Sequence, residues 1–143
     1  MKQLFQTKAT AIGGRNGHVR SEDGVIDMDV RIPTMMGGEG GAFTNPEQLF
    51  AAGYAACFDN ALIHVARLQK VQVQTETTAT VGLAMNADQT FALTVALAVK
   101  LEGVDAEVAQ QLVNKAHATC PYSNAIRGNV DVQIEVLPAP VQA

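Results

Sequence analysis

Hydrophobic and polar positions alternate over much of the second half of the chain. Because successive side chains of a strand point to opposite faces, this alternation predicts two long strands, at 71–85 and 91–101. Residues 86–89 (Asn-Ala-Asp-Gln) have the composition of a turn, so the two strands are expected to pair as an antiparallel hairpin. The same rule predicts a last strand at 130–136.

The N-terminal third has shorter segments of the same kind. Strands are expected around residues 3–12, 18–20 and 25–32. Glycine-containing turns at 13–17 and 21–24 separate them.

A helix is predicted to follow, with Asn45 as its N-cap, Pro46 at its first position and Gln48 where a capping box requires it. It is expected to end at about Gln69. Its side chains are apolar nearly all round, which predicts a central helix that is buried on more than one side.

A second helix is expected from about Asp105 to Ala118. It must end before Pro121, because proline disfavours a helical conformation in the residue that precedes it. Strands, a helix, a hairpin, a helix and a strand make an α+β fold. The chain has 143 residues, so we interpret 1–143 as a single domain.

Composition narrows the function classes. Apolar residues make up 48% of the chain and charged residues 17%, which excludes an intrinsically disordered chain. The net charge of −4 lacks the basic excess that phosphate neutralisation needs, so nucleic acid is not expected as a partner. So few charges also raise the hypothesis that the chain buries surface in an oligomer.

Location follows from the apolar runs. The longest uncharged apolar-rich stretches, 49–58 and 89–99, are shorter than the roughly 18–20 residues of a membrane span, so no membrane segment is expected. Residues 1–8 lack the continuous apolar run of a secretory signal, which makes the cytoplasm the expected location.

A glycine-rich loop at 37–41 precedes the first helix. A phosphate-binding loop would need a Lys-Ser or Lys-Thr pair after the glycines, and Glu39 would repel phosphate. We therefore interpret it as a mobile loop beside a site. Met35, Met36 and Phe43 are candidates to line an apolar substrate channel, or else are ordinary core residues.

The two cysteines carry the candidate chemistry. Cys57 lies midway along the apolar helix, where an inert buried thiol is as good an interpretation as a reactive one. Cys120 lies in a turn after the second helix, where a thiol is expected near solvent or a cleft. In a reducing cytosol such a pair is seldom a structural disulfide.

A metal site would combine these cysteines with His64 and His117. Cys57 and His64 are about 10.5 Å apart along a helix, too far for zinc bonds of about 2.0–2.3 Å. We therefore expect no metal. No bound cofactor is expected either. His64 is interpreted as a core or interface residue and His117 as a favourable residue at a helix C-terminus.

One long segment carries a family resemblance. Residues 38–58 (GEGGAFTNPEQLFAAGYAACF) resemble the central-helix signature of the organic hydroperoxide resistance (Ohr) branch of the OsmC/Ohr family. Residues 14–17 (GRNG), 120–125 (CPYSNA) and 127–132 (RGNVDV) match further, so the resemblance covers essentially the whole chain in order.

The resemblance implies a thiol-dependent peroxidase that reduces organic hydroperoxides, notably long-chain and fatty-acid hydroperoxides, to alcohols. It implies a peroxidatic cysteine at Cys57, a resolving cysteine at Cys120 and an activating pair, Arg15 and Glu47. It also implies an intertwined homodimer, with antiparallel sheets around central helices and two interfacial active sites. The implied reductant is dihydrolipoamide or a lipoylated protein.

Physical chemistry explains why such residues are needed. An ordinary thiol, with a pKa of about 8.5, is mostly protonated at neutral pH, and Cys57 lies too far along its helix to use the positive N-terminal end. Arg15 would supply a permanent cation, and Glu47 would orient the guanidinium and offset its burial. Taken alone, Arg15 would be interpreted as a solvated turn residue.

Helix spacing adds one expectation. Glu47 and Cys57 lie about 15 Å apart along one helix axis, so one guanidinium could hardly touch both within a subunit. We therefore predict that Arg15 and Glu47 act on Cys57 of the partner subunit. A cysteine-dependent hydrolase and a non-catalytic small-lipid-binding protein are the alternative functions.

Overall fold

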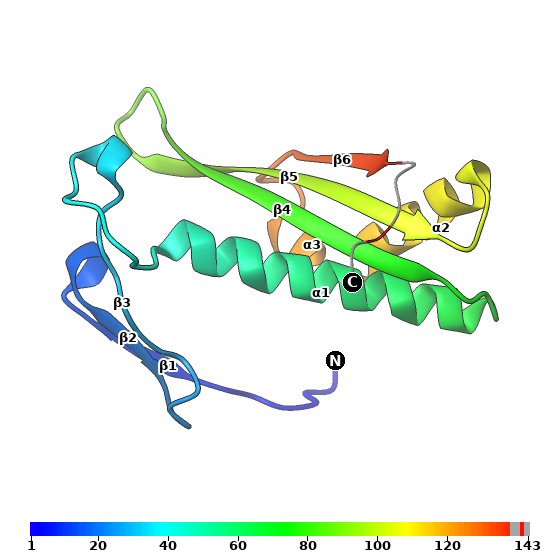
Figure 1. Ribbon diagram of the computed structural model, residues 1–143, viewed down its shortest axis with the longest axis horizontal. Helices are drawn as coiled ribbons and strands as arrows, with labels where there is room; N and C mark the ends of the chain where they lie inside the picture. The colour runs from blue at the N-terminus through cyan, green and yellow to red at the C-terminus, as the bar shows by residue number, and fades with distance from the viewer. Residues whose placement is uncertain (138–140, 142–143) are drawn as a thin grey trace. The chain divides into compact units, whose positions relative to one another are not determined.

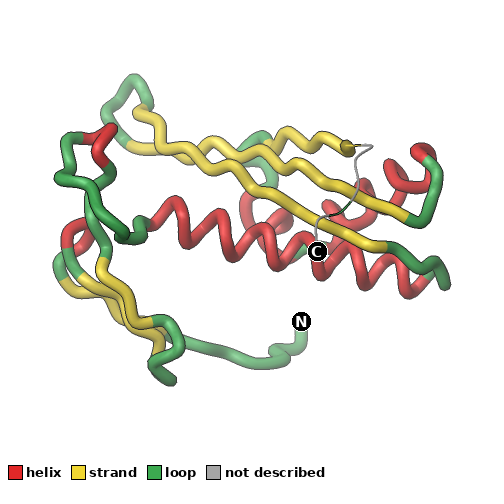
Figure 2. Tube along the Cα trace, viewed as in Figure 1, coloured by secondary structure: helices red, strands yellow, loops and turns green. Residues whose placement is uncertain are grey.

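A computed structural model describes residues 1–137 and 141 and has the predicted α+β composition (Figures 1 and 2). The chain forms two compact units, Met1–Leu49 and Phe50–Ala143, and the boundary between them falls in the first turn of a helix. The interpretation of 1–143 as one domain stays a prediction.

The first unit contains a three-stranded antiparallel sheet in the order β1-β2-β3. Its strands are β1 (Ala9–Ile12), β2 (His18–Ser21) and β3 (Asp27–Asp29). The first and third strands are shorter than the alternation predicts. β1 begins only at Ala9 because its pairing partner there, Ser21, is the last residue of β2. Two short 3₁₀ helices, η1 (Gly14–Asn16) and η2 (Thr34–Met36), complete the unit.

The second unit contains the predicted hairpin, formed by β4 (Gln74–Met85) and β5 (Phe91–Glu102). The two strands pair antiparallel along their whole length. The last strand, β6 (Val132–Leu137), pairs with β5 in parallel, so this sheet is mixed and the expectation of antiparallel sheets is wrong for this one pair of strands. The reason is that two helices connect β5 to β6, and such a crossover returns the chain to the same end of the sheet.

Those connecting helices are α2 (Ala106–Thr119) and α3 (Pro121–Ile126). The first confirms the predicted second helix, with Asp105 as N-cap and its carboxylate accepting a hydrogen bond from the Val108 N–H over 2.9 Å. The sequence analysis did not predict α3.

The long helix α1 (Pro46–Leu68) confirms the predicted first helix almost to the residue. The N–H of Gln48 donates to Asn45 Oδ1 over 2.8 Å, which satisfies one of the donors that a helix start leaves open. After the helix, Lys70 adopts a left-handed conformation (φ 57°) and the chain turns toward β4.

The core of the second unit lies between α1, the sheet and α2. Figure 1 shows the sheet extended along α1. Within one chain, α1 buries a single stripe rather than several sides, so burial of its other faces stays a prediction that concerns a dimer. The buried residues of α1 are Tyr54, Phe58, Ala61, Leu62, Val65 and Ala66.

By length and composition α1 could cross a membrane, because it has 23 residues and the mean hydropathy of an 18-residue stretch within it reaches 1.3. The sequence expectation of no membrane segment rested on uninterrupted uncharged stretches. A longer stretch of α1 is apolar on average once a charged residue within it is tolerated. One helix of this kind is weak evidence, since the core helix of a water-soluble protein has the same properties. The buried stripe of α1 is part of such a core.

Candidate active site

The fold brings the two cysteines together. The Cys120 thiol donates to the Cys57 sulfur, and the two Sγ atoms are 3.6 Å apart. Both are free thiols, with Cys57 half-buried and Cys120 buried. A disulfide bond is about 2.05 Å long, so the sulfurs must approach by only about 1.5 Å to form one.

The placement of Cys120 differs from the sequence expectation. Cys120 is fully buried rather than near solvent, because the helix α3 begins directly after it and folds it into the core. Cys120 ends α2, where its N–H donates to the Ala116 carbonyl, and also precedes Pro121, which suits the first position of a helix. The thiol therefore sits at a fixed corner between two helices.

Tyr122 fits α3 against α1. Its ring lies over Gly53, where a Cβ would come within 2.8 Å of the phenol oxygen and 3.2 Å of a ring carbon. It also contacts the rings of Phe50 and Tyr54, with centroids 6.0 and 5.8 Å away. Only glycine at position 53 leaves room for this close approach of the aromatic ring to the helix.

The backbone N–H of Tyr122 donates a hydrogen bond to Cys57. Burial raises the pKa of the Cys57 thiol above its ordinary value, and this hydrogen bond opposes the change without reversing it. The nearby Cys120 thiol raises the Cys57 pKa further. The surroundings of Cys57 within the second unit therefore do not activate it as a thiolate.

A buried hydrogen-bonded chain, which the sequence analysis missed, joins the same three helices. The hydroxyls of Tyr54 and Ser123 are 2.6 Å apart, and Ser123 Oγ lies 2.9 Å from His117 Nδ1. Tyr54 and Ser123 are fully buried. His117 thus has a side-chain partner besides its place at a helix C-terminus. One available signal was the motif at 120–125, which contains Ser123 three positions after Cys120.

Arg127, which lies at the surface, forms hydrogen bonds with residues in and next to this buried hydrogen-bonded network. Its guanidinium donates to the His117 carbonyl over 2.6 Å and to Asn124 Oδ1 over 2.5 Å. Burial, and secondarily the charge of Arg127, lower the pKa of His117, so its imidazole is neutral at pH 7.

Arg15 and Glu47 form a bidentate ion pair within the first unit. The guanidinium nitrogens of Arg15 donate to the two carboxylate oxygens of Glu47 over 2.8 and 2.6 Å. The hydrogen bonds from Arg15 hold the pKa of Glu47 below its usual value. Arg15 is therefore not the solvated turn residue that its position alone indicates.

The turn that carries Arg15 requires glycine after it. A Cβ on Gly17 would lie 1.8 Å from the Ile12 carbonyl oxygen. The short 3₁₀ helix η1 thus closes tightly and presents Arg15 toward the first turn of α1, where Glu47 lies.

The other candidate residues divide. His64 is exposed, which contradicts a core role and leaves an interface role as a prediction. Met35, Met36 and Phe43 are exposed as well, so the interpretation as ordinary core residues is wrong for a single chain. Among residues 1–137 and 141, no group of three or more His, Cys, Asp or Glu side chains is placed to hold a metal ion.

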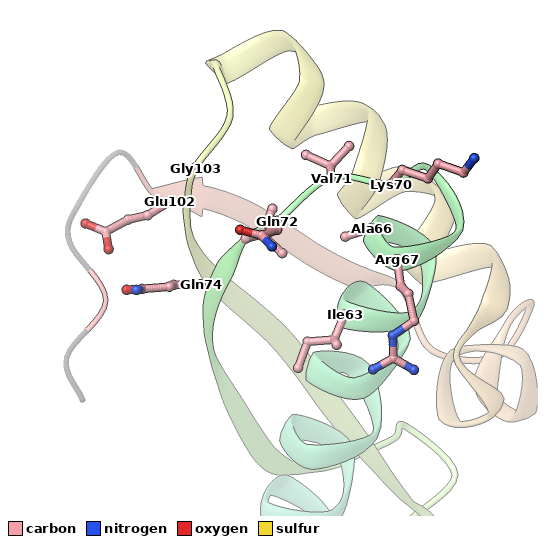
Figure 3. A pocket seen from close by; sticks show the side chains of 10 residues that line it. Ile63, Ala66, Arg67, Lys70, Val71, Gln72, Gln74, Glu102 and Gly103 are labelled. Carbon is pink, nitrogen blue, oxygen red and sulfur yellow. The ribbon is translucent and has the colours of Figure 1, made fainter.

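Two of the hollows found among the described residues bear on the sequence expectations, and neither is lined by a cysteine. One, of about 770 Å³, is at the C-terminal end of α1, and its lining runs from Ile63 to Gln74 with Glu102 and Gly103 (Figure 3). The other, of about 350 Å³, lies in the first unit beside the glycine-rich loop. Phe43 lines it, but so do Arg31 and Glu39, so it is not the purely apolar channel that was considered.

Comparison with known proteins identifies the family. The family model described as "OsmC-like protein" matches residues 38–135. The chain is 52% identical to the organic hydroperoxide resistance protein OhrB of Bacillus subtilis, over 93% of this chain and 98% of the relative. The chain belongs to the OsmC family, in its organic hydroperoxide resistance branch.

Solved structures of this branch have the same fold. An organic hydroperoxide resistance protein from Legionella pneumophila matches with a TM-score of 0.91 and 52% identity, over 94% of this chain and 98% of that one. A putative one from Vibrio cholerae, with captopril bound in one of its active sites, matches with a TM-score of 0.92 and 51% identity. It covers 99% of this chain and 97% of its own. These matches confirm the OsmC/Ohr-like fold predicted from the sequence.

Proposed function

We propose that this OsmC-family protein detoxifies peroxides as a thiol-dependent peroxidase that reduces organic hydroperoxides to alcohols. The observation that carries the proposal is the 3.6 Å contact between the sulfurs of Cys57 and Cys120. Two reduced thiols at this distance need only a small movement to form a disulfide. The names of the relatives, which refer to organic hydroperoxide resistance, support the same class of oxidant.

In the first step, the Cys57 thiolate attacks the terminal oxygen of the hydroperoxide. The O–O bond breaks, Cys57 becomes a sulfenic acid, and the alkoxide takes up a proton and leaves as the alcohol. Cys57 is the better candidate for the attacking sulfur because it is half-buried, whereas Cys120 is fully buried.

In the second step, the Cys120 sulfur attacks the sulfenic sulfur of Cys57. The S–O bond breaks and an S–S bond forms, and the thiol proton of Cys120 leaves with the hydroxyl as water. The two thiols thus supply the two electrons that reduce the peroxide, and they are converted into one disulfide.

Activation of Cys57 requires a positive charge, because burial raises the pKa of its thiol. We assign this role to Arg15, which stays protonated and offers several donors for the thiolate and for the peroxide oxygen. Glu47 orients the guanidinium through its two hydrogen bonds. In the proposed homodimer, Arg15 and Glu47 of one subunit serve Cys57 of the other, as the helix spacing predicts.

Regeneration requires a dithiol. A dithiol attacks the Cys57–Cys120 disulfide, forms a mixed disulfide and then closes on itself, which restores both protein thiols. We propose dihydrolipoamide or a lipoylated protein as this reductant, in the cytoplasm. Long-chain and fatty-acid hydroperoxides are the proposed substrates.

Counting free thiols during titration with cumene hydroperoxide tests the proposal. A peroxidase loses two thiols per molecule of hydroperoxide consumed and releases cumyl alcohol. A hydrolase would consume an activated ester at a constant thiol count, and a binding protein would do neither. Thiols that persist after an equivalent of hydroperoxide has been added would overturn the proposal.

A further inference from the structure

We propose that Tyr54, Ser123 and His117 are positioning residues that hold Cys120 against Cys57 and thereby set how readily the two thiols form a disulfide. The inference rests on the proposed roles of the two cysteines. It concerns a hydrogen-bonded chain that contacts neither sulfur through a hydrogen bond of its own, so its effect passes through the position of α3.

The hydrogen bonds among Tyr54, Ser123 and His117 connect the three helices that determine where the two sulfurs lie. Tyr54 is on α1, three positions before Cys57, and Ser123 is on α3, three positions after Cys120. His117 is on α2, three positions before Cys120. Ser123 bonds to both of the others, over 2.6 Å to Tyr54 and 2.9 Å to His117. Through these two hydrogen bonds, Ser123 joins α1, which carries Cys57, to α2 and α3, the helices on either side of Cys120.

Burial makes this connection strict. Tyr54 and Ser123 have no exposed surface, so neither hydroxyl can exchange its protein partner for bulk water. A shift of α3 away from α1 would leave the buried Tyr54 hydroxyl without its partner, although Ser123 could keep its hydrogen bond with His117. Fully satisfied buried networks of this kind fix one arrangement of the elements that they join.

Residues 120–122, directly before Ser123, provide two hydrogen-bond donors to the Cys57 sulfur. Cys120 donates its thiol to the Cys57 sulfur, and Tyr122 donates its N–H. Ser123 is the next residue, so the bond to Tyr54 determines whether these two donors reach Cys57. Tyr122 contributes a second contact to α1 through its ring over Gly53.

The matched test compares Ser123→Ala and Tyr54→Phe with Thr77→Val. The first two remove a hydroxyl of the chain. The control removes the 2.9 Å hydrogen bond from Thr77 to Asp59, which also involves α1 but on the side of the sheet. Each protein is equilibrated with reduced and oxidised dithiothreitol, and the fraction of Cys57–Cys120 disulfide is measured after acid quench.

We expect the equilibrium constant for disulfide formation to fall about three- to tenfold in Ser123→Ala and in Tyr54→Phe. Thr77→Val should match the wild type, because a general loss of stability is not what moves the equilibrium. Circular dichroism and thermal unfolding of the reduced proteins establish that each variant is folded. If Ser123→Ala does not fold, Tyr54→Phe, which removes a single oxygen atom, decides the question.

An unchanged equilibrium constant in a folded Tyr54→Phe variant, or an equal decrease in Thr77→Val, would overturn the positioning role. The measurement uses no peroxide, so it remains valid if the proposed peroxidase activity fails. In that case the wild type would form the disulfide with oxidised dithiothreitol but not with cumene hydroperoxide.

Discussion

Cys120 donates its thiol to the sulfur of Cys57 across 3.6 Å, although the two residues are 63 positions apart in the chain. The contact exists because α3 begins directly after Cys120 and is held to α1 by the ring of Tyr122 and by the hydroxyl of Ser123. A half-buried sulfur next to a fully buried one is an arrangement in which the first can react with an oxidant and the second with the product.

Replacing each cysteine separates the two proposed roles. Cys57→Ser should abolish hydroperoxide reduction, because serine cannot form the sulfenic acid. Cys120→Ser should reduce one equivalent of cumene hydroperoxide and then stall, because the resolving thiol is missing. Alcohol release per mole of protein, measured with excess dihydrolipoamide, distinguishes them. Sustained turnover by Cys120→Ser would contradict its resolving role.

Arg15→Met tests the source of the activating charge. Burial alone raises the pKa of Cys57, so a measured pKa below the ordinary thiol value requires a cation that contacts it. Removing that cation should raise the Cys57 pKa by about 1–3 pH units. Thiolate absorbance at 240 nm, followed against pH in a Cys120→Ser background, reports this directly. Arg20→Met, which removes an exposed arginine of β2, serves as the control. Equal pKa values in all three proteins would remove Arg15 from the mechanism.

Glu47→Gln should weaken activation without abolishing it, because the amide keeps one acceptor for Arg15 but loses the charge. We expect the rate constant for peroxide reduction to fall about tenfold. Asn45→Ala is a suitable control, since it removes the cap bond to Gln48 and costs about 1 kcal/mol of stability without touching the ion pair. If Asn45→Ala lost as much rate as Glu47→Gln, fraying of the start of α1, and not loss of the ion pair, would explain the decrease.

The pH dependence follows from the direction of the Glu47 shift. Its pKa lies below the 4.5 of an ordinary glutamate because Arg15 hydrogen-bonds the carboxylate. The stability that the pair contributes is therefore present above the ordinary carboxyl pKa and is lost only as the pH falls through the lower native value. Any loss of activity between pH 8 and pH 6 must then come from another group, and substituting Glu47 should not change the midpoint of that loss.

Gly53→Ala tests the fit of α3 against α1. A glycine-to-alanine change within a helix ordinarily stabilises by roughly 0.5–1 kcal/mol. Here the new Cβ would meet the phenol oxygen of Tyr122 at 2.8 Å and a ring carbon at 3.2 Å, so the ring must move. We expect a net loss of about 1–3 kcal/mol, measured by urea unfolding, and slower closure of the disulfide. A stabilised variant would show that the ring can move without cost.

The start of α1 was predictable because its causes are local. The cap at Asn45, the proline after it and the apolar face lie within one short segment, and the helix begins where they place it. The strands of the hairpin were equally visible, since alternation repeats over 12 residues in each. Such features depend only on residues that are close in sequence.

The rest of the site depends on contacts between distant segments. α3 has only six residues, too few for a helical period to be recognised, so the segment was interpreted as a turn and Cys120 was expected near solvent or near a cleft. Alternating hydrophobic positions indicate that the last segment is a strand but do not determine the direction in which it pairs. The parallel pairing with β5 therefore could not be derived from the sequence. Tyr54 and Ser123 lie 69 positions apart, and their hydrogen bond exists only in the folded chain.

Peptide mapping of the protein after one equivalent of cumene hydroperoxide tests the central claim most directly. We predict that mass spectrometry finds the peptides that contain Cys57 and Cys120 joined by a disulfide. In Cys120→Ser, the Cys57 sulfenic acid should be trapped by dimedone, so that the Cys57 peptide carries the dimedone thioether adduct. Oxidation that leaves both cysteines as free thiols, or that appears first on Cys120, would contradict the account.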